Sequence, residues 1–289
     1  MGLASKKVLI TGIESFTGKH LSTYLKSQGY EVSGTTYKDC DITVKEELEK
    51  VFTKFVPDYI IHLAGISFAA HSNTEEFYKV NTIGTLNILE TLVELDIKPK
   101  KIILASSATV YGNQHKEILD ESLCPMPANH YGASKYAMET LARNFFNKLD
   151  IIITRPFNYT GVGQEEYFLI PKIVSHYKDK KSSIELGNLD VAREFNDVDD
   201  IVKIYKQLLE VKDKSISLNL ASNRPIKLLD IIDYMNDIAG YKIEVKINKD
   251  FVRADEIKSL CGDMSLLSKI IALKFDNNIK QTLTKMYNA

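Results

Sequence analysis

The sequence predicts an α/β fold, a doubly wound parallel sheet followed by a smaller second lobe. Short apolar runs alternate with amphipathic stretches as far as Pro156. The apolar runs are almost uninterrupted, as in parallel strands that helices cover on both faces. This alternation stops after Pro156, and at 289 residues the chain is long enough for one large domain or two unequal ones.

Five strands follow from their apolar and β-branched residues. They are KKVLIT (6–11), EVSGTT (31–36), DYIIHLA (58–64), KIILASS (101–107) and DIIITRP (150–156). Between and after them, apolar residues at helical spacing predict helices from about 17, over 45–55, over 75–95, over 129–147 and over 167–177. A loop rich in Gly, Asn and Tyr, FNYTGVGQ, begins the second lobe.

The charge balance excludes several classes of partner. Lys plus Arg number 37 and Asp plus Glu 38, so we expect no nucleic-acid and no membrane partner. No apolar run approaches the roughly 20 residues of a membrane span, and a cytoplasmic location is expected. Cys40, Cys124 and Cys261 lack metal-ligand spacing, which predicts reduced thiols and no metal site.

The stretch TGIESFTG (11–18) joins the first strand to the first helix. Gly12 and Gly18 supply the outer glycines of a dinucleotide-binding turn, and Ser15 stands where the middle glycine is usual. Its hydroxyl could donate to a phosphate at the helix N-terminus, where Phe16 and Thr17 follow. An ordinary strand-to-helix turn is the alternative.

The end of the second strand indicates which cofactor is bound. An NAD site places a carboxylate there, whereas this chain has Thr35, Thr36, Tyr37 and Lys38. We therefore expect NADPH, with NADH as a possibility. Thr36 and Lys38 are candidate contacts of the 2′-phosphate, although Lys38 could equally be a solvated loop lysine. Asp41 is a candidate acceptor for the adenine amino group.

Tyr131 and Lys135, in YGASK, are four residues apart in a predicted helix and so share one face of it. A nearby ammonium lowers the pKa of a phenol, and this predicts that Tyr131 is a general acid near neutral pH. Ser107 and Thr109, in SSATVYG, follow a strand at the carboxyl edge of the sheet, where ligands bind in such folds.

These motifs, with HLAG, NTIGT and RPFN, resemble the extended short-chain dehydrogenase/reductase family, also called the NAD-dependent epimerase/dehydratase family, whose cofactor domain is a Rossmann-type sheet. The resemblance covers essentially the whole chain. It implies that Ser107, Tyr131 and Lys135 are the catalytic triad, and that Asn81 organises it. The implied cofactor contacts further include Leu63, Ala64, Gly65, Asn81 and Arg155.

The second lobe narrows the resemblance. Residues 186–202 are similar to a segment of GDP-mannose 4,6-dehydratases and GDP-4-keto-6-deoxy-mannose reductases. The resemblance implies that Arg193 and Arg253 clamp the diphosphate and that Glu256 contacts a ribose, although Arg193 beside Glu194 could also be a surface ion pair. The further substrate contacts that it implies are Ser67, Thr109, Asn158, Lys172, Leu186 and Asn188.

The same resemblance divides the chain into a dinucleotide-binding domain and a nucleotide-sugar-binding lobe. The domain is expected over 1–160, with 195–222 returning to it, and the lobe over 161–194 and 223–289. The helices over 75–95 and 129–147 imply a homodimer joined through a four-helix bundle.

Residues 108–110 decide between related reactions. Family dehydratases carry an acid there and GDP-fucose synthases a cysteine, but this chain has Ala108, Thr109 and Val110. We therefore expect reduction of the C4 ketone of a nucleotide-linked 4-keto-6-deoxy sugar, with a GDP-sugar favoured over dTDP or CDP, yielding a deoxysugar for surface polysaccharide. A 4-epimerase with tightly bound NAD is the alternative, and a non-catalytic dinucleotide or sugar-nucleotide sensor is an alternative of another class.

Overall fold

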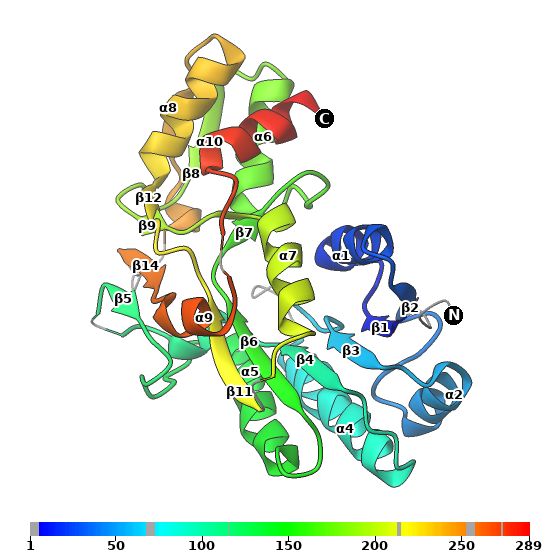
Figure 1. The fold of residues 1–289 in the computed structure, drawn as a ribbon. Coiled ribbons are helices and arrows are strands. Elements are labelled where there is room, and N and C mark those ends of the chain that lie inside the picture. The colour runs from blue at the N-terminus through cyan, green and yellow to red at the C-terminus, as the bar shows by residue number, and fades with distance from the viewer. Residues whose placement is uncertain (1–5, 68–72, 115, 213–214, 253–257, 273) are drawn as a thin grey trace.

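A six-stranded parallel sheet forms the centre of the larger part of the molecule (Figure 1). The computed structural model describes residues 6–67, 73–114, 116–212, 215–252, 258–272 and 274–289. The strand order is β11-β6-β4-β3-β1-β2, and the five predicted strands are all present. The bounds are β1 Lys7–Thr11, β2 Glu31–Thr35, β3 Tyr59–His62, β4 Lys101–Ala105, β6 Ile151–Pro156 and β11 Ile216–Leu220.

Two apolar cores lie on opposite faces of this sheet, because alternate strand residues point to opposite sides. Val8 and Ile10 belong to one core, with helices α1 (Phe16–Ser27) and α7 (Val198–Leu208). Leu9 belongs to the other, with α2 (Lys45–Phe55), α4 (Thr85–Glu94) and α5 (His130–Ala142). This confirms the doubly wound arrangement and explains the uninterrupted apolar strands.

The helix expected over 75–95 is present but is not a uniform α-helix. It consists of α3 (Thr74–Glu76), a π-helical segment η1 (Phe77–Gly84) and α4. π-helical turns are rare and occur frequently at functional sites, and η1 contains Asn81. The helix expected over 129–147 likewise ends as a 3₁₀ turn, η3 (Arg143–Phe145).

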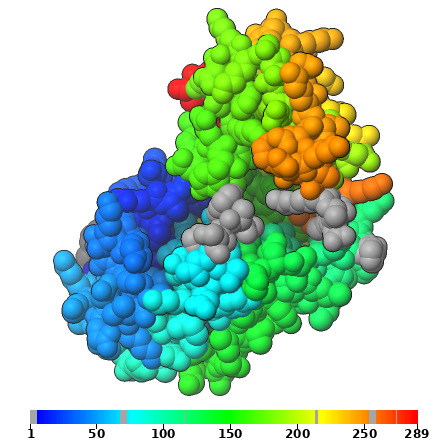
Figure 2. All heavy atoms as spheres, turned by 180° about the vertical axis from the view of Figure 1, so that it is seen from behind, coloured from blue at the N-terminus to red at the C-terminus, as the bar shows by residue number. Residues whose placement is uncertain are grey.

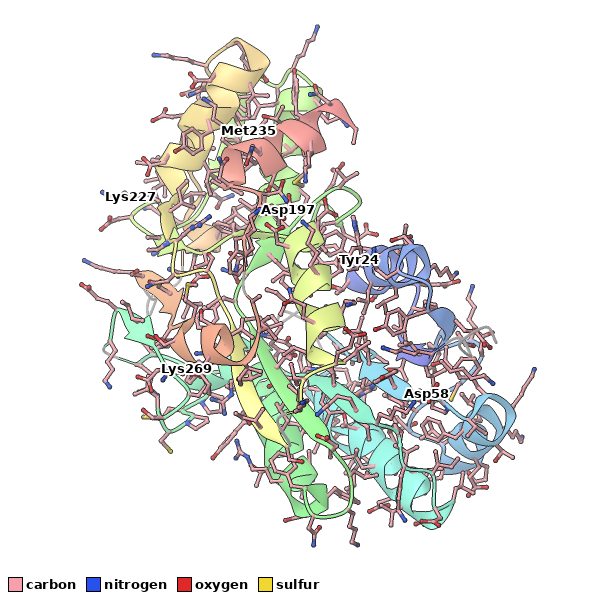
Figure 3. The ribbon with its side chains drawn as sticks, viewed as in Figure 1. Tyr24, Asp58, Asp197, Lys227, Met235 and Lys269 are labelled. Carbon is pink, nitrogen blue, oxygen red and sulfur yellow. The ribbon has the colours of Figure 1, made fainter. Side chains whose placement is uncertain are left out.

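A third core fills the second lobe. Helices α6 (Leu169–Lys178), α8 (Leu228–Ala239) and α10 (Ile279–Asn288) pack around it, beside the paired strands β8 (Ser183–Leu186) and β13 (Glu244–Ile247). Figure 3 shows Met235 of α8 in this lobe and Asp197 at its border with α7. Short elements connect the lobe to the sheet: β5 (Ile118–Leu119), β7 (Tyr159–Thr160), β9 (Ala192–Arg193), β10 (Asn196–Asp197), β12 (Ile226–Lys227), β14 (Ser259–Gly262), η2 (Ala108–Tyr111), η4 (Lys249–Phe251) and α9 (Ser265–Ile270).

The chain leaves the sheet after β6 and later returns to it. Strand β11 pairs in parallel with β6, and the preceding helix α7 packs into the sheet core. Figure 2 shows the surface hollowed where the second lobe meets the sheet domain. No helix within the described ranges is long and apolar enough to cross a membrane.

Candidate active site

The turn between β1 and α1 depends on its two glycines. Gly12 has φ +73°, and a Cβ there would lie 2.9 Å from the backbone nitrogen of Ala64, at the end of β3. A Cβ at Gly18 would overlap the carbonyl oxygens of Gly12 and Ile13. Glycine is therefore required at both positions, because the backbone of the protein itself packs against them.

Ser15 is the N-cap of α1, a role that the motif alone did not predict. Its Oγ accepts a hydrogen bond from the backbone N–H of Gly18 at 3.1 Å, so the hydroxyl proton remains available to a ligand. The first turn of α1 contains no acidic residue, and Glu14 before it is exposed. The helix N-terminus thus keeps the positive potential that favours a phosphate.

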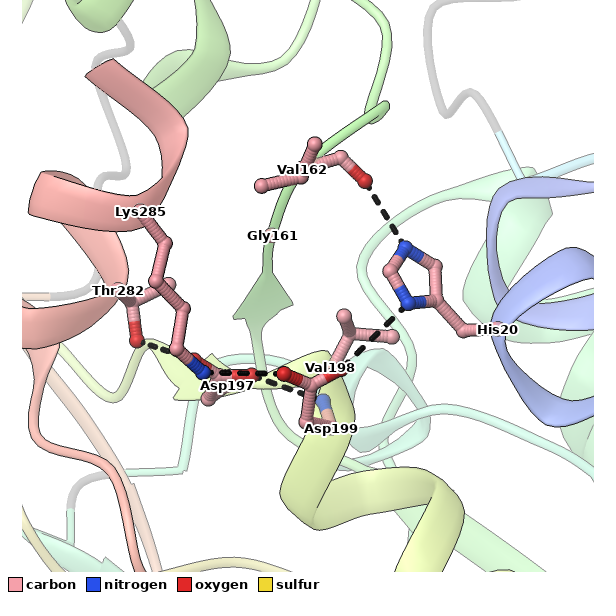
Figure 4. Close-up of a pocket in the computed structure, with 8 residues that line it drawn as sticks. All are labelled: His20, Gly161, Val162, Asp197, Val198, Asp199, Thr282 and Lys285. Carbon is pink, nitrogen blue, oxygen red and sulfur yellow. Dashed lines mark hydrogen bonds and ion pairs between the residues drawn. The ribbon is translucent and has the colours of Figure 1, made fainter. Parts of the chain in front are cut away.

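Helix α1 is bonded to β7 and to the residues that follow it. Thr17 Oγ1 is hydrogen-bonded to the hydroxyl of Tyr159 at 2.7 Å, and Phe16 stacks on the Tyr159 ring at 6.2 Å between centroids. Figure 4 shows His20 of α1 between the carbonyl oxygen of Val162, at 2.9 Å, and the carboxylate of Asp199, at 3.5 Å. Phe16 and Thr17, two predicted cofactor contacts, therefore lie where the sheet domain meets the segment that leads to the second lobe.

A carboxylate is present near the end of β2 after all. The Thr36 hydroxyl donates to Asp39 Oδ2 at 2.7 Å, and the Thr36 backbone N–H is 3.3 Å from the same oxygen. Lys38 is exposed, while the carboxylate of Asp41 accepts from the backbone and hydroxyl of Thr43. The prediction that no carboxylate lies at the end of β2 is therefore incomplete, because the Asp39 side chain turns back to Thr36, the residue directly after β2.

The loop after β3 brings Gly65 against the predicted catalytic lysine. A Cβ at Gly65 would lie 2.7 Å from Asn81 Oδ1 and 3.3 Å from Lys135 Nζ. Leu63 and Ala64, which precede it, are half-buried. Gly65, Asn81 and Lys135 thus meet at one point, although they are far apart in the sequence.

Asn81 connects three segments. Its Oδ1 accepts from the N–H of Ile66 at 2.8 Å, and its amide nitrogen donates to the Ile66 carbonyl and to Ser134 Oγ, each at 3.1 Å. Its own carbonyl accepts from the Thr85 hydroxyl. Since Ser134 belongs to α5, this fully buried side chain fixes the position of α5 relative to the loop after β3.

The structure brings Ser107 and Tyr131 together at the carboxyl edge of the sheet. Ser107 follows β4 and caps η2, and its Oγ accepts from the backbone N–H of Thr109 at 3.2 Å and from the Thr109 hydroxyl at 2.9 Å. Burial raises the pKa of Tyr131 to about 12, although a hydrogen bond with Ser107 acts in the opposite direction. The expected lowering of the Tyr131 pKa by Lys135 is therefore wrong for this state, because burial dominates.

Lys135 has a different contact. Its Nζ donates to the carbonyl oxygen of Ala105, the last residue of β4, at 2.8 Å. Burial lowers the pKa of Lys135 to about 8, against the opposing effect of the Glu139 carboxylate one helical turn away. The lysine is thus held at the sheet edge with two of its three N–H donors available.

Arg155, which the resemblance places among the cofactor contacts, points into the core instead. Its Nη2 is 2.6 Å from Glu139 Oε2, its Nε is 2.9 Å from Oε1, and its Nη1 donates to the Tyr111 hydroxyl at 3.0 Å. Glu139 also accepts from Ser106 Oγ at 2.6 Å. This buried network supports the strand and helix that carry Ser107 and Lys135.

The predicted substrate residues divide between the two lobes. Lys172 lies on α6, Leu186 is buried at the end of β8, Asn188 follows it, and Arg193 on β9 donates to the carbonyl oxygen of Ala192 at 2.8 Å. Ser67 and Asn158 are exposed beyond β3 and β6 respectively. Arg253 and Glu256 lie outside the described residues.

Sequence reasoning missed Glu139, Tyr159 and His62. Glu139 continues the row of Tyr131 and Lys135 at four-residue spacing, so helical periodicity could have found it. His62 is buried between Thr11 and Thr85, and burial lowers its pKa to about 3, which makes it a neutral hydrogen-bonding group. Within the described residues, no group of three or more His, Cys, Asp or Glu could hold a metal ion, and Cys40, Cys124 and Cys261 are free.

The chain is similar to known nucleotide-sugar enzymes over its whole length. Residues 8–221 match the NAD dependent epimerase/dehydratase family. A GDP-6-deoxy-D-talose 4-dehydrogenase from Aggregatibacter actinomycetemcomitans is 36% identical over 97% of each chain, and a GDP-6-deoxy-D-mannose reductase from Pseudomonas aeruginosa is 28% identical over 96% of this chain and 95% of the reductase.

A solved structure agrees with these relatives. The structure of RMD from Pseudomonas aeruginosa complexed with NADPH superposes with a TM-score of 0.89 at 28% identity, covering 100% of this chain and 98% of the other. The chain therefore belongs to the NAD-dependent epimerase/dehydratase family and is an enzyme that uses a nicotinamide dinucleotide to modify nucleotide sugars.

Proposed function

We propose that this enzyme reduces the C4 ketone of a GDP-linked 4-keto-6-deoxyhexose with NADPH, forming a GDP-deoxysugar for surface polysaccharide. The observation that carries the proposal is the hydrogen bond between Ser107 and Tyr131 at the carboxyl edge of the sheet, with Lys135, one turn further along α5, held at the end of β4. Both relatives named above are enzymes of GDP-6-deoxyhexoses, and this supports the substrate class.

The dinucleotide, when bound, supplies the hydride to C4. Tyr131 donates a proton to the ketone oxygen, and its raised pKa keeps the phenol protonated and able to donate at neutral pH. Ser107 Oγ, which now accepts from Thr109, has its own hydroxyl proton available to hold the same oxygen. With the dinucleotide bound, the remaining N–H donors of Lys135 would orient its ribose.

The second lobe binds the nucleotide. We propose that Arg193 and Arg253 clamp the diphosphate, since the guanidinium fork matches phosphate oxygens, and that Lys172, Asn188 and the turn after Leu186 contact the nucleoside. From the sheet domain, Ser67, Thr109 and Asn158 contact the sugar and phosphates. Glu256 is the proposed ribose acceptor.

The proposed preference for NADPH over NADH is modest. Lys38 and Thr36 favour a 2′-phosphate, but the Asp39 carboxylate beside Thr36 opposes it. An exposed lysine–phosphate contact contributes only about 0.2 to 1 kcal/mol. The attraction of a 2′-phosphate to Lys38 and its repulsion by Asp39 therefore nearly cancel. The backbone after β2 must then contribute to any larger preference.

We also propose a homodimer through a four-helix bundle. Ile83, Tyr78 and Leu95, on the helical stretch from α3 to α4, are exposed apolar side chains with fractions of 46%, 37% and 37%. Tyr78 contacts His130 at the start of α5, so the two helices lie against each other there. The free thiols fit a reducing, cytoplasmic location.

Turnover tests the proposal directly. Purified protein mixed with NADPH and GDP-4-keto-6-deoxy-D-mannose should consume NADPH and form one C4 alcohol, identified by NMR. The Tyr131→Phe variant should bind NADPH normally but turn over at least about a hundredfold more slowly. Interconversion of C4 epimers by bound NAD without net oxidation would establish the epimerase instead, and binding without any turnover would establish the sensor.

A further inference from the structure

Tyr159 lies between the helix that begins at the glycine-containing turn and the chain segment that leads to the second lobe. Its hydroxyl is bonded to Thr17 Oγ1 at 2.7 Å, and its ring stacks on Phe16 with an interplanar angle of 16°. Phe16 and Thr17 belong to the first turn of α1, whose N–H groups favour a phosphate. The position of this turn therefore depends on a residue that lies 142 positions further along the chain.

The segment that begins at Tyr159 is also bonded to the second lobe. Strand β7 starts at Tyr159 and pairs in parallel with β10. Asp197, in β10, accepts a hydrogen bond from the Thr282 hydroxyl at 2.7 Å and lies 3.2 Å from Lys285 Nζ. Both partners belong to α10, as Figure 4 shows. A series of bonds thus runs from the first turn of α1 through β7 and β10 to a helix of the second lobe.

Asn158, the residue before Tyr159, is a proposed contact of the sugar nucleotide. Its side chain is exposed, and its carbonyl oxygen accepts from the N–H of Asn196 at 2.9 Å. Tyr159 is only half-buried, so its position depends on the Thr17 bond and on the stacking with Phe16 as well as on burial. A ligand that orders Asn158 therefore also orders the first turn of α1, and a phosphate at that turn orders Asn158.

We propose that Tyr159 is a positioning residue that makes the binding of the dinucleotide and the binding of the sugar nucleotide mutually favourable. This inference rests on the proposed function, which places the sugar nucleotide at Asn158 and the dinucleotide phosphates at α1. The first ligand to bind orders the segment that the two sites share, so the second ligand loses less entropy and binds more tightly. Because the effect joins two binding equilibria, it must be equal in both directions.

The Tyr159→Phe variant tests the role, because it removes the hydroxyl and keeps the ring. Calorimetric titration should show that saturating NADPH tightens GDP binding to the parent, and that this factor is about two- to tenfold smaller in Tyr159→Phe, the effect of losing one hydrogen bond. Titration with NADPH in the presence and absence of GDP should give the same factors. Thr17→Val should reproduce the loss, and the double variant should lose no more than either single one.

Tyr177→Phe is the matched control. It removes a hydroxyl that donates to Asn236 Oδ1 at 2.8 Å within the core of the second lobe, and it should keep the factor of the parent. A hydroxyl with only a structural role would change the separate affinities and leave this factor unchanged. An unchanged factor in Tyr159→Phe, or no effect of NADPH on GDP binding to the parent, would overturn the inference alone, whereas a parent that binds no GDP would overturn the proposed function with it.

Discussion

Replacing Glu139 by glutamine isolates the energetic role of the buried network beneath the active site. Glu139 and Arg155 are 0% and 2% exposed, and they form a two-pronged ion pair. Removing one partner of such a pair leaves a buried charge uncompensated and costs about 3 to 5 kcal/mol. For a chain of this size that corresponds to a fall in Tm of about 5 to 8 °C, measured by thermal unfolding.

A surface pair supplies the control. Glu94 on α4 also contacts a lysine, Lys45, at 3.1 Å, but its side chain is 55% exposed. The Glu94→Gln variant should therefore lose no more than about 1 kcal/mol. The double variant Glu139→Leu with Arg155→Met should be less destabilised than Glu139→Gln, because the Arg155 charge is no longer left unpaired in the core.

The same change has a catalytic signature. The Glu139 carboxylate raises the pKa of Lys135, which burial otherwise lowers to about 8. Without that charge Lys135 loses its proton at lower pH, so the alkaline fall of kcat should move to lower pH in Glu139→Gln. A Tm within about 2 °C of the parent, together with an unmoved pH profile, would refute the role assigned to this network.

Further substitutions test three other parts of the molecule. Asp39→Ala should raise the ratio of kcat/KM with NADPH to kcat/KM with NADH several-fold, and Lys38→Ala should lower this ratio. If neither variant changes the ratio, the end of β2 does not determine the choice between NADPH and NADH. Hydrogen bonds lower the pKa of Glu210 to about 2. This contribution to stability exists above the usual pKa of 4.5 and disappears as pH falls toward 2, so Glu210→Gln should cost up to about 1 kcal/mol at pH 7 and less at pH 3 by urea unfolding. Ile83→Asp should yield monomers in sedimentation, and a monomeric parent would contradict the dimer.

Strands β1, β3, β4 and β6 were predictable because each is a short apolar run bounded by polar residues, whereas β11 was not predicted as a strand. Leu9 and Ile10 face opposite cores, so buried strands of this kind have no polar side to obscure them. The π-helical segment around Asn81 was not predictable, since its residues have ordinary helical spacing, and the contacts of Asn81 with Ile66 and Ser134 come from distant parts of the chain.

The candidate site shows the same limit. The spacing of Tyr131 and Lys135 was readable, but the direction of their pKa shifts depends on burial and on Ala105 and Glu139, which only the tertiary structure brings into place. Asp39 was visible in the sequence, but its return to Thr36 depends on a tight turn whose hydrogen bonds no propensity specifies.

The return of the chain through α7 to β11 means that the second lobe is not a removable module. A cut at Gly161 would take away Val198, Ile201 and Tyr205, which fill the core beneath α1, and the edge strand that covers β6. To exchange the second lobe with that of a relative, the chain would therefore have to be cut on both sides of residues 198–220, so that this segment stays in its own sheet. New substrate specificity is more readily introduced by altering the second-lobe segments that precede and follow residues 198–220 than by fusing whole domains end to end.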